Sequence, residues 1–413
     1  MEMPAEAAKK LNAEIAAWRR ALHAVPETGL NLPRTREYIL SVLDETGLDY
    51  RLHHGSSGIE VLIEGTRPGA MAEAVALRAD MDALPIAEKT GLSFASANGC
   101  MHACGHDAHA AMLLGAARLL AERRERFSGR VKCIFQPGEE GHGGAERMIA
   151  EGALENPHVG AVIGIHVTNV LRELAPGAIG LKKGALMASS DAFAVKALGK
   201  GGHVANPDHV VNPVYIAAEI VTALRRLFEE FRVPPKKAKT LLSVGTISGG
   251  RAGNAVPDDV VIQGSVRSLD ADERREILSR MERVAAETAL RMGGACEVEI
   301  ADSCGIVRND DELTDLVAAA AEKLFPDEKT AEIVTDIMAS EDISRFFEAR
   351  KGVYIHLGCG FEDGREVFPL HNAKFDLNED VLWKGAALLA RSAMDVLDRA
   401  TLPNRGGPRP DTR

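Results

Sequence analysis

The strongest constraint on the fold is a change along the chain in the order of predicted strands and helices. Short apolar runs alternate with helical stretches in the first and last parts, whereas a strand–helix–strand–strand–helix–strand order fills the middle, from about residue 189 to 307. Alternating strands and helices favour a largely parallel or mixed sheet with helices on both faces. The order of the middle segment is typical of a small ferredoxin-like α+β domain. Because the first pattern resumes afterwards, we expect an α/β domain with a second domain inserted into it.

The chain of 413 residues is also too long for one ordinary core, which supports two domains. We place the α/β domain at 1–188 and 308–400 and the insert at 189–307, with hinges near 187–191 and 304–309. The tail at 401–413, rich in Pro, Gly and Arg, is expected to be disordered.

Periodicity gives the expected elements of the α/β domain. Amphipathic or alanine-rich stretches predict helices at 5–22, 35–46, 105–125 and 143–152. Apolar, β-branched runs predict strands at Ile59–Ile63, Ala74–Leu77, Val131–Phe135, Val159–Ile165 and Val353–Leu357.

Composition argues against some classes of binding partner and indicates the cellular compartment. A net charge of −11 without a dense Lys/Arg run argues against nucleic acid as a partner. No run of about 18 apolar residues suggests a membrane span, and the first residues lack the pattern of a signal peptide. The six cysteines have no paired spacing, so we expect a reducing, cytoplasmic setting.

Polar side chains follow several predicted strands, at the edge of a sheet where functional loops gather. Asp80 and Asp82 follow the second strand, the pair Glu139–Glu140 the third, His166 the fourth, and His371 comes after the last. Another cluster, Cys104-Gly105-His106-Asp107-Ala108-His109, stands directly before the alanine-rich helix.

The cluster before the helix could hold a metal ion. A thiolate and an imidazole two residues apart can meet at one ion if the chain bends at Gly105, which lacks a Cβ. By itself the cluster fits a buried thiol and a solvated histidine equally well. Singly, a Glu–Glu pair is more often a solvated surface and a lone histidine more often structural. Their joint placement at strand ends favours a metal site.

Five side chains are more than one tetrahedral ion needs. They suit two divalent ions roughly 3.5–4 Å apart that share a bridging water or thiolate, and Cys104 as a thiolate qualifies as an anionic bridge. Because neighbouring residues on extended backbone point in opposite directions, one carboxylate of the Glu139–Glu140 pair can bind metal while its neighbour remains free to act as a general base. The candidate ligands are Cys104, His106, Glu140, His166 and His371.

The chain resembles the aminoacylase-type metalloamidohydrolases, in the branch of hippurate hydrolases, bacterial N-acyl-amino-acid amidohydrolases and plant auxin-conjugate hydrolases. The resemblance runs from about residue 15 to 395. It is carried by an ordered set of motifs: Trp18–His23, Pro26–Glu27, Arg78–Pro85, Met101–Asp107, Gln136–Glu140, Gly164–His166, Gly199–His203 and Pro369–Asn372.

The resemblance implies a two-domain enzyme whose five ligands are those above and whose base is Glu139. It implies two divalent ions per chain, with manganese first and zinc or another ion as alternatives, and a homodimer or higher homo-oligomer formed through the inserted lid. Asp82 would orient His106, and His203 would stabilise the oxyanion. His109 then becomes a helix-face residue and Asp107 a local support of the turn.

Two residues of the insert are expected to touch substrate. Asn254 matches a substrate-contacting position of the family. Arg267 could bind a carboxylate bidentately. An equally good interpretation is that Arg267 is only a charged residue on the surface of a strand.

We therefore expect a metal-dependent amidohydrolase that cleaves N-acyl amino acids or related small amides. A hydrolytic deaminase or decarbamoylase of a small specialised metabolite is an alternative that uses the same site. A metal-stabilised binding protein without activity is a third, which Glu139 argues against because a binder needs no base. Unusual residues at 204–209, 224–231 and 338–343 leave the acyl and amine preferences open.

Overall fold

The computed structural model describes residues 4–69, 73–171, 173–232 and 239–400. The tail at 401–413, for which we expect disorder, lies outside the described residues. Two compact units emerge. The α/β unit comprises the described parts of 1–184, 309–335 and 345–413, and the insert comprises those of 185–308 and 336–344.

The α/β unit is built on one eight-stranded mixed sheet, which confirms the predicted fold class. The strands that neighbour one another along the centre, β4, β3, β5 and β16, are all parallel. The pairs β1–β2, β2–β4 and β16–β6 are antiparallel, and the outer pair β6–β15 is parallel. In spatial order they are β1 (Tyr50–Leu52), β2 (Ile59–Glu64), β4 (Arg130–Gln136), β3 (Ala74–Asp80), β5 (Val159–Thr168), β16 (Lys351–Gly358), β6 (Ile179–Leu181) and β15 (Ala331–Glu332). The carboxyl ends of the central strands therefore meet at one edge of the sheet.

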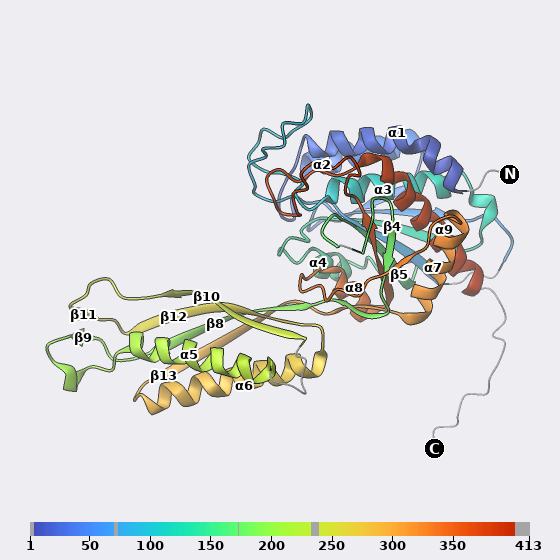
Figure 1. Ribbon diagram of the computed structural model, residues 1–413. Coiled ribbons are helices and arrows are strands. Elements are labelled where there is room, and N and C mark those ends of the chain that lie inside the picture. The colour runs from blue at the N-terminus through green and yellow to red at the C-terminus, as the bar shows by residue number, and fades with distance from the viewer. Residues whose placement is uncertain (1–3, 70–72, 172, 233–238, 401–413) are drawn as a thin grey trace, which may run out of the picture. The chain divides into compact units, whose positions relative to one another are not determined.

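Helices cover both faces of this sheet, as Figure 1 shows for α1 and α3 above it and α4 and α8 below it. Their bounds are α1 (Pro4–His23), α2 (Pro33–Thr46), α3 (His106–Ala121), α4 (Gly144–Ala150), α7 (Asp311–Leu324), α8 (Ile343–Ala349) and α9 (Leu382–Ala400). The alanine-rich α3 is buried on nearly every side. At Gly115 a Cβ would lie 2.9 Å from Ile15 of α1 and 3.0 Å from Ala386 of α9. This close approach fixes the position of α3, and with it the Cys104–His106 turn at its start.

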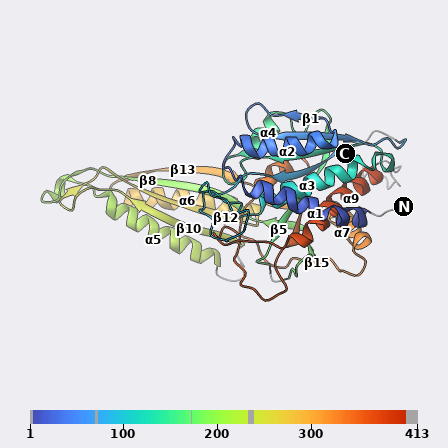
Figure 2. The same ribbon diagram turned by 90° about the horizontal axis from the view of Figure 1, so that it is seen from above.

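The insert has the ferredoxin-like topology that its sequence predicts. Its elements are β8 (Ser189–Leu198), α5 (Pro213–Arg232), β10 (Thr240–Ser248), β12 (Asp259–Ser268), α6 (Ala271–Arg291) and β13 (Ala295–Cys304). The strands form an antiparallel sheet in the order β10-β12-β8-β13. Both helices pack on one face of that sheet, over a core that includes Phe193, Ile220 and Ile262 (Figures 1 and 2).

Two short pairings complete the insert and its connections. Strand β9 (Gly202–His203) pairs with β11 (Ala255–Val256), and β7 (Gly184–Met187) pairs with β14 (Val307–Asn309) where the chain enters and leaves the insert. The segment 336–344, which the sequence places in the α/β domain, groups with the insert. It does so because Ile337 bridges to Met187 and the Met338 carbonyl accepts a hydrogen bond from Arg267.

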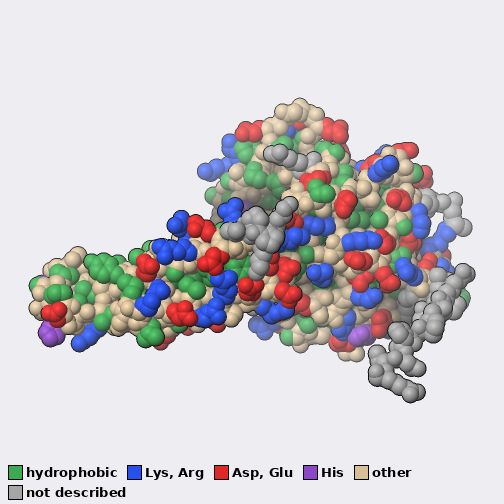
Figure 3. All heavy atoms as spheres, turned by 60° about the horizontal axis from the view of Figure 1, so that its bottom comes forward, with side chains coloured by type: hydrophobic (Ala, Val, Ile, Leu, Met, Phe, Trp, Pro, Cys, Tyr) green, Lys and Arg blue, Asp and Glu red, His purple; other side chains and the backbone are tan. Residues whose placement is uncertain are grey.

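On the face of the α/β unit that Figure 3 shows, basic and acidic side chains are interspersed. Among the helices that the structure describes, none combines the length and the apolar character that crossing a membrane requires. All six cysteines are free thiols.

Candidate metal centre

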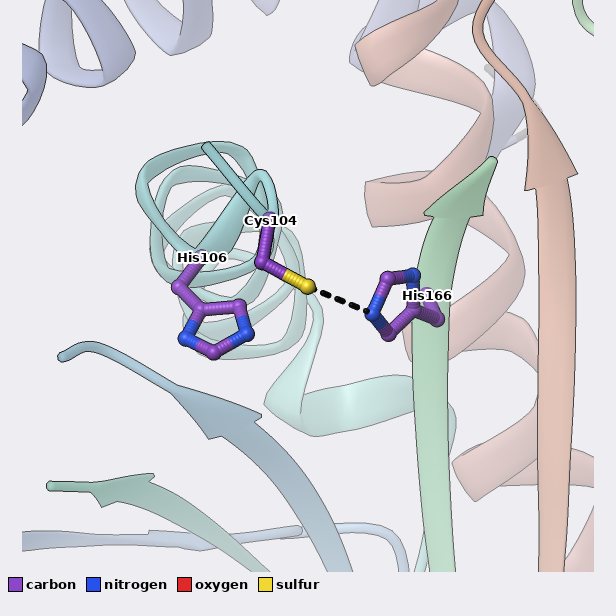
Figure 4. Close-up of side chains that lie close together, drawn as sticks. All are labelled: Cys104, His106 and His166. Carbon is purple, nitrogen blue, oxygen red and sulfur yellow. Dashed lines mark hydrogen bonds between the residues drawn. The ribbon is translucent and has the colours of Figure 1, made fainter. Parts of the chain in front are cut away.

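The five predicted metal ligands come together at the carboxyl edge of the mixed sheet. One group of ligand atoms that all lie within 4.8 Å of one another belongs to Cys104, His106 and His166, and a second to Cys104, Glu140 and His371. Figure 4 shows Cys104 and His106 at the start of α3 and the Cys104 sulfur directed toward His166 on β5. The Cys104 Sγ lies 3.5 Å from Nε2 of His166 and 3.3 Å from Nε2 of His371. Cys104 thus stands in both groups, as a bridging ligand must.

The two imidazoles from α3 and β5 present their Nε2 atoms to this centre. His106 donates from Nδ1 to the Asp82 carbonyl over 2.9 Å, and its buried Nε2 has no hydrogen-bond partner in the described chain. His166 donates from Nδ1 to the Val167 carbonyl over 2.6 Å. When Nδ1 carries the proton, Nε2 of a neutral imidazole has a free lone pair. Two buried nitrogen lone pairs beside a thiol form a donor set that fits a divalent metal of the zinc or manganese type.

The glutamate pair is held by Asp82. Each oxygen of the Asp82 carboxylate accepts one backbone N–H, from Glu139 and from Glu140, at 3.1 Å in both cases. The two side chains diverge in their contacts. Glu140 Oε1 lies 3.3 Å from His371 Nε2, whereas Glu139 Oε2 lies 3.9 Å from His106 Nε2. Asp82 therefore positions the candidate base as well as His106, and the sequence predicts only the contact with His106.

The contact between Asp82 and His106 differs in detail from the expectation. The main-chain carbonyl of Asp82 accepts the hydrogen bond from His106, and its carboxylate oxygen Oδ1 lies further from the same nitrogen, at 3.4 Å. The carboxylate is already occupied by the two backbone amides of the glutamate pair.

His109 is not the simple helix-face residue that the sequence suggests. It is wholly buried, donates from Nδ1 to Asp80 over 2.6 Å, and accepts the Val167 N–H at Nε2 over 2.9 Å. The expectation fails because the sheet order brings the ends of β3 and β5 against the first turn of α3, which periodicity alone does not reveal.

Asp107 also reaches beyond the local turn. Its Oδ2 accepts hydrogen bonds from Arg19 Nε and His23 Nδ1, each over 2.7 Å, so it ties the turn to α1. Burial lowers the pKa of His23, but the Asp107 charge and the hydrogen bonds to Asp107 and Glu88 outweigh it and raise that pKa to about 9. Arg19 and His23 belong to the motif Trp18–His23, but the sequence does not show that Asp107 is their partner.

The centre attracts positive charge. Hydrogen bonds to Cys104 and Glu140 raise the pKa of His371 to about 10. Burial raises the pKa of Asp80, yet the neighbouring His106, His109 and Arg78 hold it well below its ordinary value. His371 itself has a left-handed backbone, with φ of 62°, which side chains other than glycine adopt at a cost. Negatively charged groups around these imidazoles favour the binding of a cation.

The predicted site residues of the insert, His203, Asn254 and Arg267, lie in two different parts of it. The β9–β11 pairing sets His203 opposite Ala255, and the Val204 N–H donates to the Asn254 carbonyl over 3.4 Å, so His203 and Asn254 are neighbours. His203 is exposed, and its Nδ1 accepts the Ala205 N–H over 3.1 Å.

Arg267 lies elsewhere in the insert. Its Nη1 donates to the Met338 carbonyl over 3.0 Å and contacts Ser340 Oγ at 3.4 Å. It is partly buried and is engaged with the 336–344 segment.

Comparison with known proteins identifies the family. The model of "Peptidase family M20/M25/M40" matches residues 76–395. The chain belongs to the M20 family. It is 36% identical over 389 residues to thermostable carboxypeptidase 1 of Saccharolobus solfataricus, covering 91% of this chain and 95% of the relative. It is likewise 36% identical to N-acetyl-L-cysteine deacetylase of Bacillus subtilis, covering 94% and 89%.

A solved structure agrees with these sequence relatives. A dinuclear metal-binding M20 peptidase from Bacillus subtilis superposes with a TM-score of 0.80 at 30% identity, over 95% of this chain and 100% of the other. The resemblance to the amidohydrolase branch, which includes hippurate hydrolase and the auxin-conjugate hydrolases, is confirmed. The chain is therefore an M20 hydrolase, and one solved structure of its family is described as a dinuclear metal-binding peptidase.

The turn between Cys104 and His106 gives a prediction for this M20 hydrolase. Gly105 has φ of 85°, and a Cβ there would lie 2.4 Å from Cγ2 of Val167, the residue after His166. We expect Gly105→Ala to lower the free energy of unfolding by about 1–3 kcal/mol and to reduce bound metal. Urea unfolding and metal analysis of the purified variant measure both effects.

Gly91 is the matched control, because it has a similar φ of 77° but no atom within 4 Å of its added Cβ. Gly91→Ala should show backbone strain of about 1 kcal/mol without loss of metal. Full metal content in Gly105→Ala would contradict the expected loss of metal.

Proposed function

We propose that this M20 hydrolase cleaves the amide bond of N-acyl amino acids or related small amides, with two divalent cations held by Cys104, His106, Glu140, His166 and His371. The observation that carries the proposal is the pair of ligand groups that share Cys104, with the Glu139 carboxylate beside them. A bridged pair of cations next to a carboxylate is the arrangement used for metal-assisted hydrolysis.

When bound, the cations would make water more acidic and polarise the amide carbonyl. Manganese is our first choice and zinc the alternative, because a thiolate with imidazoles and one carboxylate accepts either. The side chains then have distinct roles. Glu139 takes the proton of the attacking water and delivers it to the departing amine. Its position is set through its backbone N–H, which Asp82 accepts.

The oxyanion that forms during attack needs a hydrogen-bond donor, and we assign this role to His203. Because its Nδ1 accepts the Ala205 N–H, its Nε2 carries the proton of the neutral ring and can donate. Asn254, which lies next to His203, is the proposed contact to the substrate amide.

The names of relatives support the substrate class. Relatives across the whole chain are called N-acetyl-L-cysteine deacetylase and hippurate hydrolase, and both names describe removal of an acyl group from an amino acid. Arg267 is proposed to contact the substrate carboxylate through the guanidinium nitrogens other than Nη1. We also propose a cytoplasmic homodimer formed through the insert.

A hydrolysis screen with metal analysis tests the proposal. We expect about two divalent ions per chain and, with manganese added, release of the amino acid from N-acetyl, N-benzoyl or indole-acetyl amino acids. Chelation should abolish the activity and added metal should restore it. Turnover confined to N-carbamoyl or amino-substituted metabolites would favour the deaminase or decarbamoylase alternative. Two bound ions without turnover of either class would favour the binding protein.

A further inference from the structure

A third cluster shares His106 with the proposed metal centre, and its other two members, Asp80 and His109, have no role in the mechanism above. Ligand atoms of Asp80, His106 and His109 lie within 4.8 Å of one another, and all three residues are buried. The three residue types of this cluster are common metal ligands. The hydrogen bonds of His109, however, indicate that it does not bind a cation itself.

His109 has no lone pair left for a cation. The Val167 N–H can only donate, so Nε2 of His109 must accept, and the ring proton must then lie on Nδ1. From Nδ1 the proton is donated to Asp80 Oδ1 over 2.6 Å. The backbone of β5 therefore sets the tautomer of His109 and aims its one N–H at Asp80.

Asp80 is held from both sides. Its Oδ2 accepts a hydrogen bond from Arg78 Nη1 over 2.7 Å, and Arg78 Nε donates to Gln136 Oε1 over 2.8 Å. The same Oδ2 lies 3.9 Å from His106 Nε2, the atom that faces the metal centre. A carboxylate fixed at this place adds negative charge beside a metal ligand without giving up its own hydrogen bonds.

We propose that His109 is a positioning residue that, through its Nδ1–H, holds the Asp80 carboxylate beside His106 and thereby strengthens cation binding. The inference rests on the proposed metal centre. Partners that orient groups around metal ligands typically change metal affinity 10- to 100-fold when they are replaced. The effect comes from the hydrogen bond to Asp80 and not from the volume of the ring, and this separates positioning from packing.

Two substitutions separate the two hydrogen bonds of His109. In His109→Asn the amide nitrogen can occupy the place of Nδ1 and donate to Asp80. In His109→Gln the amide oxygen can occupy the place of Nε2 and accept the Val167 N–H, but the donor to Asp80 is lost. We expect manganese affinity, measured by competition with a chelator, to fall about 10- to 100-fold in the glutamine variant and to stay within about threefold of wild type in the asparagine variant.

Asp80→Asn is the second test, because it removes the charge and keeps the shape. It should weaken manganese binding as much as His109→Gln does, and it carries the test if the glutamine variant does not fold. His53→Gln is the matched control, since His53 is also buried and bonded to two carboxylates, Glu60 and Glu151, that belong to none of the clusters. The control should leave manganese affinity unchanged.

The outcomes divide cleanly. Equal losses in the asparagine and glutamine variants, or no loss in either, would overturn the positioning role while the metal centre stands. Unchanged affinity in Asp80→Asn would overturn it as well. A wild-type chain that binds no manganese and no zinc would overturn the proposed metal centre itself, and the inference with it.

Discussion

Replacement of Glu139 by glutamine is expected to lower kcat by about 10²- to 10⁴-fold while metal content stays at the wild-type level. Glutamine has nearly the same shape, and the backbone N–H that Asp82 accepts is retained. The side chain, however, can no longer take a proton from water or deliver one to the amine. Steady-state kinetics on an N-acyl amino acid, together with metal analysis, measure the two quantities.

Two matched glutamates make this experiment specific. Glu140, the adjacent residue, lies 3.3 Å from His371 and is a proposed ligand, so Glu140→Gln should reduce bound metal as well as activity. Glu146 is exposed on α4, where it pairs with Arg345, and Glu146→Gln should change neither. A Glu139→Gln variant that keeps kcat within about fivefold of wild type would rule out Glu139 as the base.

Much of the architecture can be predicted from the sequence because its signals are local. Apolar, β-branched runs mark strands that are buried on both faces, and β3 is buried at all seven of its residues. The order of predicted strands and helices distinguishes the insert from the α/β unit. The rule that functional loops follow parallel strands then groups residues such as Glu140 and His166 before any coordinates are known.

The supporting contacts could not be predicted in the same way, because they depend on which strands are neighbours. His109 meets Asp80 and Val167 only because β3 and β5 are adjacent, a pairing with no local signature in the chain. Asp107 and Arg19 are 88 residues apart. The motif resemblance includes both residues but says nothing of their contact. Likewise, the 336–344 segment joins the insert through a single bridge and hydrogen bonds that composition cannot reveal.

The buried ion cluster between α1 and α3 gives the largest effect expected on stability. Arg19 is wholly buried and donates to Asp107 over 2.7 Å and to Glu379 over 3.1 Å. Arg20, the next residue, also bonds Glu379, but its side chain is 53% exposed. The two arginines therefore differ in burial and share an acceptor, which isolates the effect of burial.

We expect Arg19→Met to lower the free energy of unfolding by about 3–5 kcal/mol, because it leaves the buried Asp107 charge with His23 as its remaining ion-pair partner among the described residues. Arg20→Met should lower the free energy of unfolding by less than about 1 kcal/mol, since water can solvate the Glu379 carboxylate when the exposed Arg20 guanidinium is removed. Urea unfolding followed by circular dichroism measures both. Equal losses would show that the cluster acts through Glu379, which both arginines contact. A loss confined to Arg19→Met would place the effect at Asp107, the residue that follows His106, and would make this ion pair the support of the metal-binding turn.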